Sequence, residues 1–135
     1  MFINISLACT LMAGTTVIHA LGMMLVFWFF SRPIGHMPLP RIFGISGVVL
    51  LMFVVTVVEV MLWALVYVGL NTIETFERAL YFSMVTYTTL GYGDIVLEQK
   101  YHLLSSFEAA NGIIMFGWTT SIVIASVQKL YLHSK

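Results

Sequence analysis

Residues 86–94 read Thr-Tyr-Thr-Thr-Leu-Gly-Tyr-Gly-Asp, and this stretch decides the fold. Its glycines, Gly91 and Gly93, stand two positions apart. Glycine enters the left-handed region of backbone space freely, so the pair permits dihedral angles that alternate and aim successive carbonyls to one side. Carbonyl oxygens that face one way can replace the water shell of a cation. The simpler interpretation, a glycine-rich turn between helices, gives no reason for the two threonines that precede the glycines.

The composition places the chain in a lipid bilayer. Of its 135 residues, 60% are hydrophobic and 9% are charged, whereas soluble domains carry about 25% charged residues. The net charge is zero, which gives no reason to expect nucleic acid as a partner. Cys9 is the single cysteine, so no intrachain disulfide can form. The sequence has no metal-ligand spacing, nucleophile elbow or phosphate loop, and we expect neither an enzyme nor an organic cofactor.

Three apolar stretches exceed the roughly 20 residues that cross a bilayer as a helix. The predicted membrane helices lie within residues 1–31, at 42–68 and at 102–130. A shorter apolar segment, 73–88, ends at the quoted stretch and is predicted to be a re-entrant helix. The expected fold is therefore an all-α integral membrane protein with three transmembrane helices and one short re-entrant helix. The N-terminal stretch lacks a basic region and a cleavage site, so we expect a retained helix and not a signal peptide.

The surroundings of the short helix favour a cation site at its end. Asn71 and Glu74 have the spacing of a capping box, which predicts the helix start. Its C-terminal end near Thr88 carries the negative end of the helix dipole. Irregular backbone at membrane depth, as expected at 89–93, requires burial in protein or a water-filled cavity. An ordinary interfacial helix is the alternative.

The basic residues predict the orientation. All three prolines fall in segment 32–41, which is expected to be a loop. One side of a three-span arrangement holds four basic residues and the other holds two: Arg32, Arg41, Lys129 and Lys135 against Arg78 and Lys100. The positive-inside rule then places loop 32–41 and the C-terminus in the cytoplasm, with the N-terminus outside.

Residues 89–94 resemble the signature of tetrameric potassium channels, whose filter core reads Thr-Val-Gly-Tyr-Gly; Leu90 stands in place of the valine. The resemblance covers the pore region within 42–135 and implies an outer helix, a pore helix, a filter at 89–93 and an inner helix. It implies a homotetramer like the small prokaryotic channels, in a bacterial inner membrane, with residues 1–31 as an extra helix. Potassium would be coordinated by oxygens of these filter residues: Thr89, Leu90, Gly91, Tyr92 and Gly93. Asp94 would lie at the outer mouth, in agreement with the charge-based orientation.

The resemblance also implies residues that support the filter. Some family members carry a glutamate at the position of Val85, which here is apolar. Tyr81 is then the expected hydrogen-bond partner of Asp94, and Thr88 belongs to the last turn of the pore helix.

Polar and small residues of the third span suggest gating roles. Gly112 is the better candidate for a hinge and Gly117 the second, although both could simply permit close helix packing. Asn111 either lines a cavity below the filter or makes an interhelical hydrogen bond. A stripe of small residues four apart would serve a helix-bundle crossing or a packing seam: Gly117, Ser121 and Ala125.

Three ionisable side chains fall inside the predicted spans. Intramembrane carboxylates are costly and often functional. For Glu59 we favour a brace for the pore helix or filter. For Glu108 we favour an interfacial position, solvated or paired with Arg78 or Lys100. His19 is expected to be a neutral partner of a neighbouring helix, with a pH-sensitive contact as the alternative.

The expected function is passive, single-file conduction of potassium. A weakly selective monovalent cation channel and a non-conducting channel-like subunit are the alternatives. We expect no soluble ligand-binding domain, and the first helix has no repeated arginines of a voltage sensor. We expect that helix to pack peripherally against the second.

Overall fold

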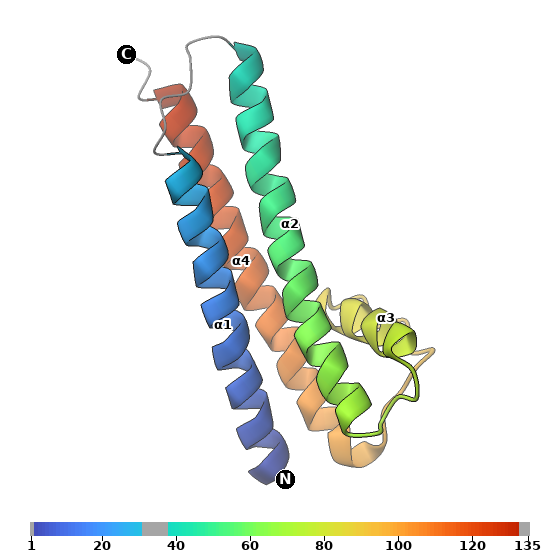
Figure 1. Cartoon of the computed structure of the whole chain (residues 1–135). Helices are drawn as coiled ribbons and strands as arrows, with labels where there is room; N and C mark the ends of the chain where they lie inside the picture. The colour runs from blue at the N-terminus through green and yellow to red at the C-terminus, as the bar shows by residue number, and fades with distance from the viewer. Residues whose placement is uncertain (1, 31–37, 133–135) are drawn as a thin grey trace.

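The computed structural model describes residues 2–30 and 38–132, with side chains at 2–28 and 42–129. Three long helices lie side by side, and a short fourth helix packs beside α2 and α4 near one end of the bundle (Figure 1). The elements are α1 (Phe2–Phe30), α2 (Pro38–Gly69), α3 (Phe76–Tyr87), the 3-10 turn η1 (Gln99–Tyr101) and α4 (His102–Leu132). An all-α fold with three long apolar helices and a short one is therefore confirmed.

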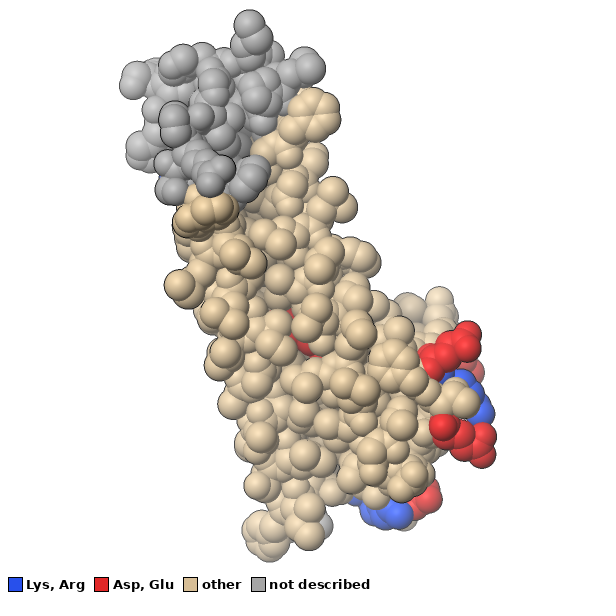
Figure 2. Space-filling view, in the orientation of Figure 1, with Lys and Arg blue, Asp and Glu red and all other residues tan. Residues whose placement is uncertain are grey.

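Among the described residues, three helices are long and apolar enough to cross a membrane: Phe2–Trp28, Ile42–Gly69 and Gln99–Lys129. Large apolar side chains on their outer faces are exposed in the single chain, as a lipid-facing surface requires. On the face that Figure 2 shows, charged side chains gather mainly over α3 and the adjacent end of the bundle. The chain is a multi-pass membrane protein.

The second helix begins earlier than expected. It starts at Pro38, so the end of the predicted loop 32–41 is helical; residues 31–37 lie outside the described part. Proline is tolerated in the first turn of a helix because the amide hydrogens of that turn have no intrahelical acceptor. Pro38 and Pro40 therefore lie in the first turn of α2, and Pro33 lies outside the described residues.

The start of α3 is a correction to the predicted capping box. The helix begins at Phe76, and the Thr75 hydroxyl accepts a hydrogen bond from the Arg78 amide at 3.3 Å. Asn71 belongs to the turn that ends α2 and has a φ of 52°, a conformation that asparagine tolerates. Glu74 lies outside the helix, and α3 is a few residues shorter than the expected 73–88.

The first helix is less peripheral than expected, because it packs against both α2 and α4. Against α2, Gly22 permits close approach, since a Cβ there would lie 2.5 Å from Cγ2 of Val55. At the end of the bundle where α4 begins, the Asn4 side chain donates a hydrogen bond to the Lys100 carbonyl. The start of α1 and the connection into α4 are thereby held at the same end of the bundle (Figure 1).

Candidate functional site

The chain reverses immediately after α3, and hydrogen bonds to the last turn of that helix fix the reversal. Thr89 donates its amide to the Thr86 carbonyl at 2.9 Å, and Leu90 donates to the Val85 carbonyl at 2.9 Å. The Thr88 hydroxyl donates to the Met84 carbonyl at 2.7 Å. Thr88, a predicted support residue, therefore satisfies its own helix end. The hydrogen bonds to the last turn of α3 therefore fix the position of Thr89 and Leu90, the first residues of the predicted filter.

Positive φ angles occur at every second residue of this segment. The values are 60° at Thr89, 57° at Gly91 and 76° at Gly93. The two glycine conformations were expected and are confirmed. The threonine conformation was not, because a β-branched residue with positive φ is an outlier that costs of order 1–3 kcal/mol. The hydrogen bonds of Thr89 and Leu90 to the end of α3 keep Thr89 in this strained conformation. Strain that is maintained in this way indicates that the direction of the backbone carbonyls in this segment is functionally important.

Residues 88–94 are all exposed in the single chain. No heavy atom lies within 4 Å of a Cβ built at either Gly91 or Gly93. The requirement for glycine therefore comes from the backbone angles and not from a lack of space within one chain. An exposed, irregular backbone of this kind in a membrane protein needs a polar or protein surface beside it.

Asp94 follows the segment and is held from α3. The Tyr81 hydroxyl donates a hydrogen bond to Oδ2 of Asp94 at 2.8 Å, as the sequence led us to expect. This hydrogen bond raises the pKa of Tyr81 above its ordinary value. Val85 is buried and offers no carboxylate at the position where some potassium channels have one. Tyr81 thus supplies a hydrogen bond to the carboxylate that closes the segment.

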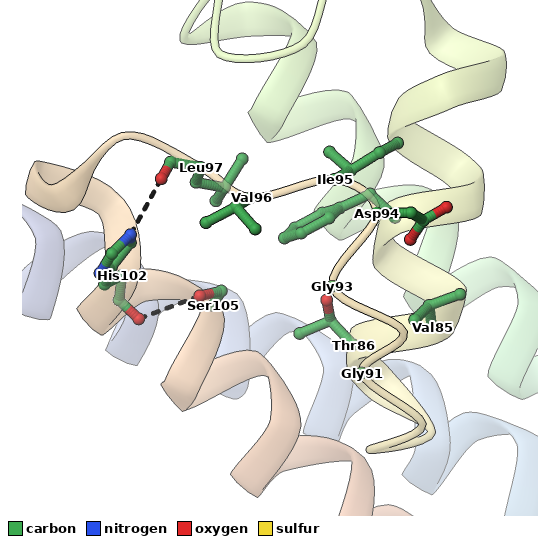
Figure 3. A pocket seen from close by; sticks show the side chains of 11 residues that line it. Val85, Thr86, Gly91, Gly93, Asp94, Ile95, Val96, Leu97, His102 and Ser105 are labelled. Carbon is green, nitrogen blue, oxygen red and sulfur yellow. Dashed lines mark hydrogen bonds between the residues drawn. The ribbon is translucent and has the colours of Figure 1, made fainter.

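A pocket of about 170 Å³ lies between the segment, α3 and the start of α4 (Figure 3). Gly91 and Gly93 line one side, and His102 and Ser105 line the other. The His102 ring bonds to the Leu97 carbonyl at 2.9 Å, which fixes the opposite wall. The backbone of the segment is therefore not packed solidly against its own chain on this side.

Glu59 lies within reach of the end of α3. It is fully buried, and its Oε2 accepts a hydrogen bond from the Tyr87 hydroxyl at 2.7 Å. Its Oε1 lies 2.9 Å from Nδ1 of His19 on α1. Tyr87 is the last residue of α3 and directly precedes the irregular segment. This geometry fits the brace that the sequence suggested, and His19 bonds to a neighbouring helix as expected.

Glu108 is a correction, because it is neither solvated nor paired with Arg78 or Lys100. It is fully buried and accepts hydrogen bonds from the Tyr67 hydroxyl, at 2.7 Å, and from the Ser83 hydroxyl. Lys100 pairs instead with Glu98, at 2.8 Å. Ser83 also lies 3.0 Å from the Val60 carbonyl, so this second carboxylate joins α2, α3 and α4.

The tyrosines of the two carboxylate sites were missed in the sequence. Tyr67 and Tyr87 are large, but a buried tyrosine hydroxyl needs a hydrogen-bond partner. Two intramembrane carboxylates beside two tyrosines in adjoining helices were the available signal.

Gly112 and Asn111, two candidate residues of α4, pack against other helices of the chain. Gly112 lies against the end of α3, where a Cβ would be 1.9 Å from the Tyr87 carbonyl oxygen. Its position therefore requires close approach. Asn111 is fully buried and donates to the Thr15 hydroxyl at 2.8 Å, which is the interhelical hydrogen bond that was one of its two predicted alternatives. Gly117 has no neighbour within 4 Å and lies on an exposed face with Ser121 and Ala125.

We expect Tyr67→Phe to lower the free energy of unfolding by about 1–3 kcal/mol, because a buried carboxylate loses a donor. Thermal unfolding in detergent micelles measures the loss. Tyr81→Phe is the matched control, since it removes a hydroxyl from a partly exposed side chain that binds exposed Asp94. Equal losses in the two variants would contradict a structural role for the Glu108 site.

Comparison with known proteins gives one family. The family model Ion_trans_2, described as an ion channel, matches residues 49–129, which is more than half of the chain. The match contains most of α2, all of α3, the irregular segment and nearly all of α4. No curated protein and no solved structure matches.

Proposed function

Because the chain belongs to this ion channel family, we propose that it is the pore-forming subunit of a homotetrameric potassium channel. The alternation of positive φ at Thr89, Gly91 and Gly93 is the observation that carries the proposal. A chain with such angles can turn successive carbonyls toward one axis. Membership of an ion channel family also makes the function transport and not enzymatic catalysis.

Four copies follow from the geometry of coordination. One segment of backbone cannot surround an ion, but four segments around an axis give stacked rings of oxygens. The exposure of residues 88–94 and of the Gly117 face of α4 in the single chain supports such an assembly. Residues 42–135 form the pore domain in this proposal, with α3 as the re-entrant pore helix. The N-terminus and Asp94 face outward, and the C-terminus lies in the cytoplasm.

Potassium is the transported ion, and it moves down its electrochemical gradient. Dehydrated ions pass in single file between oxygens of the filter: Thr89, Leu90, Gly91, Tyr92 and Gly93. Repulsion between ions at adjacent sites prevents tight binding from trapping them. The C-terminal end of α3 adds negative dipole charge that favours a cation below the filter.

A weakly selective cation channel is the second candidate. Leu90 replaces the valine of the core motif, and Val85 leaves Asp94 without a carboxylate neighbour at that position. Selectivity depends on the number and field of the oxygens, so a loosely held segment would admit sodium.

Ion flux into liposomes separates the two candidates. We expect purified protein to carry potassium in preference to sodium, with block by barium, and to have the native mass of four chains. Equal sodium flux would replace potassium selectivity with the second candidate. A monomer or dimer that conducts would contradict a filter built from one segment of each chain.

A further inference from the structure

All four helices meet around one buried pair, Glu59 and His19, and α1 lies outside the residues that the family matches. Glu59 on α2 contacts His19 on α1 at 2.9 Å and Tyr87 on α3 at 2.7 Å. From α4, the Trp118 ring stacks on His19 with centroids 5.3 Å apart. The Thr119 hydroxyl lies 3.3 Å from Nε2 of the same histidine. His19 precedes the matched residues 49–129, so this contact is an addition to the family's pore region.

The hydrogen bonds converge on Glu59 from two sides. The Thr119 hydroxyl can donate to Nε2 of His19, which leaves Nδ1–H to donate to Oε1 of Glu59. The other carboxylate oxygen, Oε2, accepts from the Tyr87 hydroxyl. Each oxygen of Glu59 then has one donor. A buried carboxylate is tolerated only with such partners, so loss of either donor changes how the other is held.

Movement of Tyr87 would reach the filter segment directly. Tyr87 is the last residue of α3, and its carbonyl oxygen lies against Gly112, so its backbone has little room. Thr89 and Leu90 hydrogen-bond to carbonyls of the same helical turn. The position of the Tyr87 side chain is therefore coupled by short contacts to the start of the segment with alternating φ.

We infer that His19 is a positioning residue for ion selectivity: it acts through Glu59 and Tyr87 to hold the end of α3 and the filter segment that follows. This inference rests on the proposed function. According to this inference, α1 contributes to ion selectivity and is not only an additional membrane anchor.

Three substitutions of His19 test which atom matters. His19→Leu removes the donor, and we expect the ratio of potassium to sodium flux to fall by about tenfold with the oligomer intact. His19→Asn places an amide nitrogen on Cγ, as Nδ1 is, and should restore most of the ratio. His19→Gln places its amide one atom further along, where Nε2 lies, and should not. Wild-type selectivity in His19→Leu would overturn the inference.

Thr15→Val is the matched control on the same helix. It removes the hydrogen bond that joins Thr15 to Asn111 of α4 but leaves Glu59 untouched. We expect it to keep the wild-type flux ratio. An equal fall in Thr15→Val and His19→Leu would show general loosening of α1 and would overturn a specific role for His19.

A second readout does not depend on conduction. His19→Leu and Tyr87→Phe remove donors to one carboxylate, so their losses in Tm should combine to less than their sum in the double variant. Thr15→Val and Tyr87→Phe should add. If the wild type fails to select potassium while the first pair is coupled, the proposed function falls but the link from His19 to Tyr87 stands. Additive losses in both pairs would overturn the link itself.

Discussion

We expect Gly91→Ala to abolish potassium-selective flux while the protein still assembles in the membrane. The φ of Gly91 is 57°, a conformation that costs an alanine about 1–2 kcal/mol in each copy. In a tetramer the cost recurs four times around one axis, and the segment relieves it by turning a carbonyl away from the ion path. Flux of potassium into liposomes, together with native mass, measures both parts of the expectation.

Gly47→Ala is the matched control for this change. Gly47 lies in α2, has no neighbour within 4 Å of a Cβ and does not have a positive φ. Replacing a helical glycine by alanine stabilises a helix by roughly 0.5–1 kcal/mol, so flux should be retained. Normal selective flux in Gly91→Ala would show that the left-handed conformation is dispensable and that coordination has another origin.

The second large effect is expected at Gly112. In Gly112→Ala the new Cβ would lie 1.9 Å from the Tyr87 carbonyl oxygen, a backbone atom that cannot rotate away. Either α4 or the end of α3 must shift, with a cost of about 1–3 kcal/mol or more. We expect a lower Tm and a loss of ion selectivity, because the segment proposed as the filter follows the end of α3 directly.

Gly117→Ala is the matched control for Gly112→Ala on the same helix. Gly117 lies one and a half helical turns further along α4 with open space around its Cβ position. We expect Gly117→Ala to lower the Tm less than Gly112→Ala does, since its added methyl group displaces nothing within the chain. If Gly112→Ala matches the wild type in both Tm and selectivity, the close packing of α4 on Tyr87 is required neither for stability nor for ion selectivity.

Much of the fold could be predicted from hydropathy alone. Twenty-residue apolar stretches leave few alternatives to membrane helices, and α2 and α4 follow the expected spans closely. Boundaries were less predictable because they depend on short-range competition. Asn71 and Thr75 are both good caps, and only the turn after α2, which takes Asn71, decides between them.

The candidate site also has features that the sequence predicts and features that it does not. Gly91 and Gly93 indicate positive φ angles, because few other residues tolerate them, whereas a threonine at position 89 does not predict the positive φ found there. The environment of Glu108 could not be read, since it depends on tyrosine and serine hydroxyls from two other helices. Sequence spacing shows which residues share a helix face but not which helices meet around a carboxylate.

The position of α1 is where the structure differs most from the sequence-based expectation. A first span placed beside the second would contact lipid and α2 alone, yet α1 also reaches α4 through Thr15 and His19. Polar side chains in such a span are costly without partners in neighbouring helices. Their presence in α1 is the signal that this helix packs against α4 as well as against α2.

The reversal potential of wild-type channels in a planar bilayer, with potassium on one side and sodium on the other, tests potassium selectivity most directly. We expect a reversal potential far from zero, of the sign that opposes potassium flow, which collapses when Gly91 is replaced by alanine. A wild-type reversal potential near zero would mean that sodium passes as readily as potassium and would contradict a potassium-selective filter at residues 89–93.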